Sequence, residues 1–113
     1  MKSAPPQDGG DDQRVFRALA DPTRRRLLDA LRDGPRTTGD LCSAHPEMTR
    51  FGVMCHLDVL TDAGLVLVTR AGRTRLNHLN PVPLRLVYER WMRPLAETAA
   101  VDLVRLKQAA ERS

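Results

Sequence analysis

The hydrophobic spacing of the chain changes period twice, and these changes limit the folds open to it. Up to Gly64, apolar residues recur every three or four positions, which is the period of an amphipathic helix. From Leu65 to Leu79 the pattern is β-branched and then alternates with period two, as strands do. After Pro83 the helical spacing returns. The pattern predicts a mainly α-helical α+β fold with one small β-hairpin.

Cap residues divide the first part of the chain into helices. The first helix is expected over residues 12–20. Asp21 is a good N-cap and Pro22 suits the first helical position, so a second helix begins there and ends before Gly34–Pro35. Residues 1–11 are rich in Pro, Gly and Asp, and are expected to form a disordered tail.

Two further helices are expected to form a helix-turn-helix. A brief helix capped by Thr37 or Thr38 ends at the turn that Pro46 imposes. The next helix begins at Thr49 and stops at Gly64. Its inward face is predicted from apolar residues spaced by four and three, which are Val53, Leu57 and Leu60.

The rest of the chain supplies a hairpin and a long helical stretch. The strands are expected over residues 65–69 and 74–79, with a turn at Ala71–Gly72. In the helical stretch after Pro83, Pro94 should cause a kink or a restart, because its ring clashes with a preceding carbonyl. The order α-α-α-α-β-β-α is that of a winged helix-turn-helix, expected as a single domain over residues 12–113.

The charges fall where such a fold meets DNA. The net charge is +4, which weakly favours polyanions. Between Asp62 and Glu89 no acidic residue occurs, whereas arginines cluster beside the hairpin tip. We expect these arginines to reach phosphates or the minor groove, and the alternative is a solvated hairpin. They are Arg70, Arg73 and Arg75.

The helix that begins at Thr49 is the expected recognition helix. Such helices read bases chiefly with their N-terminal turns, and the residues expected to lie outward or on the flank are Thr49, Arg50, Phe51, Gly52, Cys55 and His56. An outward Phe51 is the unusual feature. It either contacts thymine methyl groups in the major groove or folds back onto the core, and the sequence leaves both readings open.

The segments ALADPTRRRLL and HLDVLTDAGLV, together with the Gly72–Arg73 tip, closely resemble the ArsR/SmtB family of winged-helix repressors. The resemblance covers Val15 to Trp91. It implies a homodimer that pairs through its first and last helices and binds an operator in double-stranded DNA with inverted-repeat symmetry. The side chains expected at the dimer interface are Phe16, Trp91, Leu95, Leu103 and Leu106.

The metal-sensing motifs of that family are not found in this sequence. The family's Cys-x-Cys-Asp-Leu site would fall at Thr37–Leu41, where no thiol stands, and no histidine follows His78 for the family's other site. Thiolate or imidazole clusters are what soft metals require. No metal and no cofactor are therefore expected.

Two cysteines remain to be explained. Cys42 is expected in the core, and Cys55 outward on the recognition helix, where an oxidised thiol would obstruct DNA. Two cysteines are also too few for a secreted disulfide scaffold, and no run of about 18 apolar residues occurs, so a cytoplasmic protein without membrane insertion is expected.

The sequence favours a metal-independent, dimeric DNA-binding repressor and not an enzyme, because no catalytic triad, phosphate loop or paired carboxylates stand out. Two alternatives stay open. One is a winged-helix module that binds proteins, with Phe51 and Val59 as its docking patch. The other is a thiol- or metal-responsive repressor that uses Cys55 or Cys42.

Overall fold

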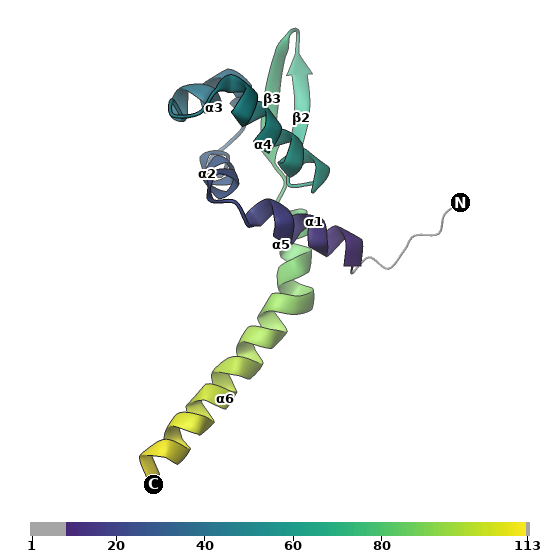
Figure 1. Ribbon diagram of the computed structural model, residues 1–113. Coiled ribbons are helices and arrows are strands. Elements are labelled where there is room, and N and C mark those ends of the chain that lie inside the picture. Colours follow the sequence, from purple (N-terminus) through teal and green to yellow (C-terminus); the bar gives the residue numbers. More distant parts are fainter. Residues whose placement is uncertain (1–8, 113) are drawn as a thin grey trace, which may run out of the picture. The chain divides into compact units, whose positions relative to one another are not determined.

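The elements follow the predicted order, with one short strand added. The computed structural model describes the backbone of residues 9–112 and the side chains of residues 12–98 and 101–112. It divides into two units, Met1–Pro83 and Leu84–Ser113, which are described separately. The elements are α1 (Gly9–Leu19), α2 (Pro22–Ala30), β1 (Arg36–Thr37), α3 (Thr38–Ala44), α4 (Arg50–Asp62), β2 (Val66–Ala71), β3 (Thr74–Leu79), α5 (Val82–Val87), the π-helix η1 (Tyr88–Met92) and α6 (Arg93–Arg112) (Figure 1).

Side-chain caps fix where three of the helices begin, as the sequence predicts. The Asp21 carboxylate accepts two backbone N–H groups of α2, and Pro22 occupies the first turn. Of the two candidate caps for α3, Thr37 is the cap, and its backbone and side chain form a reciprocal capping box with Asp40. Thr49 caps α4. Helix α1 begins at Gly9, three residues before the expected start, and residues 1–8 of the expected tail lie outside the described residues.

The sheet has three antiparallel strands in the order β1-β3-β2. The sequence predicts the hairpin but not β1, because a two-residue strand has no period to detect. The side chain of Asn77 in β3 explains where β1 lies. Its fully buried amide donates to the carbonyl of Arg36 at 3.2 Å and to Oγ1 of Thr38 at 3.1 Å. A buried amide needs such partners, so Asn77 holds β1 and the start of α3 to the sheet.

The hairpin turn lies one residue later than expected. Pairing continues to Ala71 and Thr74, so the loop is Gly72–Arg73 rather than Ala71–Gly72. Gly72 has a φ of 64°, a conformation that glycine adopts without strain and that a type II′ turn requires at this position. Arg73 is thereby placed at the tip of the hairpin.

The core of the first unit is built around α4. Its three predicted inward residues, Val53, Leu57 and Leu60, are fully buried. They lie in a core with aliphatic side chains of α2, α3 and β2 and their flanks, namely Leu27, Leu31, Leu41, Leu65 and Val66. Burying a leucine side chain contributes about 1.5–3 kcal/mol, so this face determines how α4 is seated.

In the second unit a π-helix separates α5 from α6, which confirms the predicted interruption near Pro94. The backbone N–H of Arg93 donates to the carbonyl of Tyr88, five residues back. Proline has no N–H and its ring crowds the carbonyl four residues before it, so one wider turn accommodates Pro94. Among the helices described, none has the length and apolar character needed to span a bilayer.

Replacement of Leu57 by alanine tests this account of the core. Because Leu57 is fully buried, we expect the free energy of unfolding to fall by about 2–5 kcal/mol in urea denaturation. Leu67→Ala is the matched control, since Leu67 is exposed on β2, and its effect should stay below about 1 kcal/mol. Equal losses in the two variants would contradict the proposed seating of α4.

Candidate nucleic-acid interface

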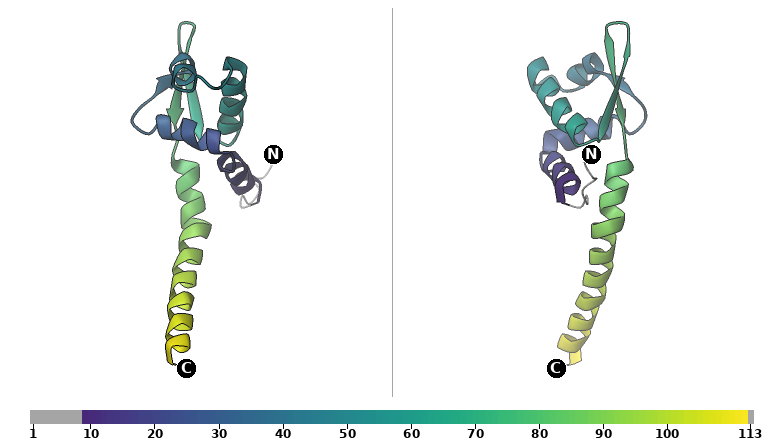
Figure 2. Two further views of the ribbon diagram at one scale, coloured as in Figure 1. Left: turned by 60° about the vertical axis from the view of Figure 1, so that its left-hand side comes forward. Right: turned by 90° about the vertical axis from the view of Figure 1, so that its right-hand side faces the viewer.

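Helices α3 and α4 form a helix-turn-helix, and the β2–β3 hairpin lies beside it and extends past both helices (Figure 2). The turn is fixed by His45, a buried side chain whose Nδ1 lies 2.9 Å from the carbonyl oxygen of Leu41. His45 is therefore accounted for as the residue that closes α3. The hairpin has the position of a wing next to a recognition helix.

The N-terminal turns of α4 present an exposed face. Thr49, Arg50, Phe51 and Cys55 are all exposed. Phe51 is 77% exposed, so of its two expected positions the outward one is observed. Gly52 donates its N–H to Thr49 at 2.9 Å, and a side chain at this position would meet the Thr49 hydroxyl at 3.2 Å. Gly52 thus belongs to the cap of the helix as well as to its surface.

A cationic cleft lies between the helix-turn-helix and the wing. It has a volume of about 460 Å³. Four arginines line it, one from α4 and three from the wing, together with small and polar residues around the start of α3. The lining residues are Thr37, Thr38, Gly39, Arg50, Met54, Arg70, Arg73, Thr74 and Arg75. Several guanidinium groups that face one cavity form a site for anions such as phosphate.

The wing arginines differ in their surroundings. Arg70 and Arg73 are exposed. The side chain of Arg75 is only 16% exposed, and its Nη2 lies 4.0 Å from the carboxylate of Asp58 in α4. Its Nε donates to the amide oxygen of Asn77 at 3.4 Å. Arg75 therefore connects the wing to α4, whereas Arg70 and Arg73 line the cleft with exposed side chains.

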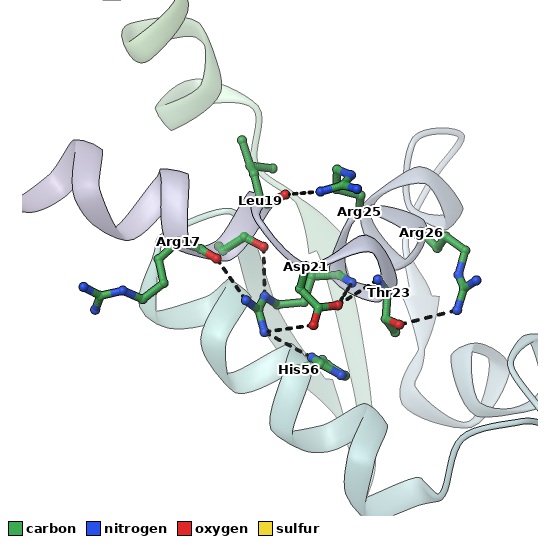
Figure 3. A network of polar contacts seen from close by, with 9 residues as sticks. Arg17, Leu19, Asp21, Thr23, Arg25, Arg26 and His56 are labelled. Carbon is green, nitrogen blue, oxygen red and sulfur yellow. Dashed lines mark hydrogen bonds and ion pairs between the residues drawn. The ribbon is translucent and has the colours of Figure 1, made fainter.

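His56 lies on the flank of α4 that faces α2. It is half-buried, and its Nδ1 is 3.3 Å from Nη1 of Arg24. Figure 3 shows His56 beside Asp21, the N-cap residue of α2. The side chain that the sequence places on the edge of the DNA-reading surface is thus engaged with another helix.

Comparison with known proteins identifies the family. A helix-turn-helix domain model matches residues 19–69. The crystal structure of an ArsR family transcriptional regulator is similar with 32% sequence identity and a TM-score of 0.74, over 83% of this chain and 95% of that one. The chain belongs to the ArsR family. It is thus a winged helix-turn-helix transcriptional regulator, and the resemblance seen in the sequence is confirmed.

Other relatives of this ArsR-family chain match over shorter segments. The HTH-type transcriptional regulator CmtR of Mycobacterium tuberculosis is 52% identical over 60 residues, which is 53% of this chain and 50% of the relative. This match therefore spans half of CmtR. The transcriptional repressor SdpR of Bacillus subtilis is 35% identical over 71 residues, 63% of this chain and 78% of SdpR.

The cysteines of this ArsR-family chain are two separate thiols. Cys42 is half-buried in α3, and Cys55 is exposed on α4. Among the residues that the structure describes, no three His, Cys, Asp or Glu side chains are grouped so as to hold a metal ion.

The expected dimer residues occur in both units. In the first, Phe16 is half-buried on α1. In the second, the apolar side chains on η1 and α6 are about half exposed or more, namely Trp91, Leu95, Leu103 and Leu106.

Sequence reasoning overlooked Arg24 and Asn77. Arg24 is one of three consecutive arginines at the start of α2, and its partner His56 lies 32 residues away, so no local pattern shows the contact. Asn77 looks like an ordinary polar residue of an alternating strand. The available signal was spacing, because Arg24 precedes the buried Leu27 and Leu28 by three and four positions and shares their face of α2.

Proposed function

We propose that this chain is a dimeric transcriptional repressor that binds an inverted-repeat operator and does not require a metal ion. The observation that carries the proposal is the cationic cleft between the wing and the exposed start of α4. A DNA duplex presents phosphates beside the base edges of its major groove. A cleft of arginines beside an exposed recognition helix matches both features.

The contacts divide by position. Exposed Arg70 and Arg73 on the wing would bind backbone phosphates, and these contacts carry little sequence information. Base edges would be read from the N-terminal turns of α4, by Thr49, Arg50 and Cys55. The exposed ring of Phe51 would contact thymine methyl groups, which apolar side chains recognise.

A second copy of this chain would complete the operator complex. Leu103 and Leu106 of α6 are 65% and 66% exposed, and with Leu95 they recur at the spacing of a helix-pairing stripe. Phe16 and Trp91 are the further expected interface residues. A two-fold pair presents two recognition helices to successive major grooves, which accounts for an inverted repeat. Repression would follow from the exclusion of polymerase.

Metal independence is proposed from the residues at the family's thiolate site. Thr37 and Gly39 stand at its two cysteine positions: Thr37 caps α3, and Gly39 has no side chain to bind a metal. A hydroxyl is a poor ligand for soft metals. Neither residue supplies the thiolate that this site requires.

The test is fluorescence anisotropy of the purified protein with DNA from upstream of its own gene, against a scrambled duplex of equal length. We expect preference for the upstream DNA and a steep decrease in affinity between about 50 and 200 mM salt, because phosphate contacts release counterions. Addition of zinc or EDTA should leave the affinity unchanged. If the protein prefers neither duplex, the repressor function is refuted in favour of a winged-helix module that binds proteins.

Single arginine substitutions test the division of contacts. Arg73→Ala should weaken binding to both duplexes equally and reduce the salt slope by about 0.9, the value for one phosphate contact. Arg50→Ala should instead reduce discrimination by about 1–3 kcal/mol. Arg32→Ala, an exposed arginine outside the cleft, is the charge-matched control. A similar loss of discrimination from Arg50→Ala and Arg73→Ala would refute the assignment.

Sedimentation velocity tests the dimer. Leu103→Asp should shift the protein from dimer to monomer, because the dimer would bury a carboxylate in an apolar interface. Leu103 is exposed in the single chain, so the variant should fold. Gln108→Asp adds the same charge on the opposite side of α6 and should remain dimeric. Dissociation by Gln108→Asp alone would place the interface on the other face.

A further inference from the structure

Arg24 contacts groups from two other helices. Its Nε donates to the carbonyl of Ala18 at 2.8 Å, and its Nη2 donates to the carbonyl of Arg17 at 2.9 Å, both in the last turns of α1. Its Nη1 lies 3.3 Å from Nδ1 of His56 in α4. The side chain is only 14% exposed. One guanidinium thus joins α2, to which it belongs, with the end of α1 and the recognition helix.

The contacts with α1 supply donors to carbonyls at the end of a helix, of which that of Arg17 also accepts the N–H of Ala20. The last carbonyls of a helix have no intrahelical donor, and a cation near that end is favoured by the helix dipole. Arg25 donates in the same way to the carbonyl of Leu19. The end of α1 is therefore held by two arginines of α2, and Arg24 uses its remaining nitrogen for α4. Dashed lines in Figure 3 mark these contacts.

The contact with α4 depends on the protonation state of His56. A guanidinium has donors only, so Nδ1 of His56 has to be the acceptor, and this requires a neutral imidazole. A protonated ring offers N–H donors on both nitrogens and adds a positive charge 3.3 Å from Nη1 of Arg24. Protonation therefore removes the acceptor for Arg24 and places two cations side by side, while the nearby Asp21 carboxylate attracts the imidazolium.

The other charged group near His56 is Asp21, whose carboxylate lies 3.9 Å from Nη1 of Arg24. Burial acts to raise the pKa of Asp21, but hydrogen bonds from the backbone of Arg24 and Thr23, together with the charges of His56 and Arg24, outweigh it and hold the pKa below its ordinary value of 3.8. Asp21 thus stays ionised above about pH 5, the range in which imidazole side chains titrate. From α1, the neighbouring groups are backbone carbonyls, while the side chain of Arg17 points away (Figure 3).

We propose that Arg24 is a positioning residue for DNA recognition, which ties the recognition helix to the end of α1 through neutral His56, and that protonation of His56 releases this tie. The proposal rests on the DNA-binding function proposed above. It also assigns His56 a role on the inner flank of α4 instead of a base contact. Operator discrimination should therefore decrease on acidification, because a loosely held helix distinguishes base edges less well.

The experiment measures the ratio of affinities for operator and scrambled duplex at about pH 8 and about pH 5.5, the range of imidazole titration. Any protonated histidine raises the affinity for both duplexes, and this general gain cancels in the ratio. The wild-type ratio should fall by about tenfold, the effect of one hydrogen bond to a charged group. His56→Gln keeps an acceptor that cannot be protonated, so its ratio should stay constant. His78→Gln, the control on the wing, should follow the wild type.

Arg24→Lys keeps the charge but loses the forked geometry, so its ratio should be low at both pH values. Circular dichroism at each pH verifies that every variant is folded. If His56→Gln loses discrimination as the wild type does, or folded Arg24→Lys retains it, the tie is refuted while the repressor function stands. If the wild type prefers neither duplex at pH 8, the repressor function fails and the positioning role fails with it.

Discussion

The seating of α4 is the constraint on which the rest of the DNA-reading surface depends. Three fully buried residues, Val53, Leu57 and Leu60, fix one side of this helix in the core. Each residue of a helix turns by 100°, so fixing one side also fixes which residues point outward. Phe51 and Cys55 point outward for that reason, and their placement requires no contact of their own. Arg50 is the first residue of the helix and lies on the flank nearer the buried face.

Apolar packing seats α4, but two polar contacts determine what lies beside it. Arg75 reaches from the wing to Asp58, and Arg24 reaches from α2 to His56. Both arginines are mostly buried, unlike Arg73 at the wing tip. In this cationic protein, position within the fold therefore separates the arginines that hold elements together from those that remain exposed.

The sequence predicted what is encoded locally. Caps such as Asp21 and Thr49 act within one turn, and the inward face of α4 follows from spacing alone, so these predictions were confirmed. The strand β1 and the partner of Arg24 depend on residues about 30 to 40 positions away, and no local pattern records them. The same limit applies to Arg75, which the sequence grouped with the exposed arginines of the wing.

The use of a guanidinium between α1 and α4 has a physical reason. An apolar side chain at Arg24 would leave the carbonyl of Ala18 without this donor and the carbonyl of Arg17 with only the N–H of Ala20, and carbonyls near a helix end are costly to leave unpaired. Arginine supplies several donors in a fixed plane, so it satisfies α1 and contacts His56 at once. In a dimer paired through α1, this contact would join the interface to the recognition helix. The separation of the two recognition helices, on which an inverted repeat depends, would then vary with the geometry at Arg24.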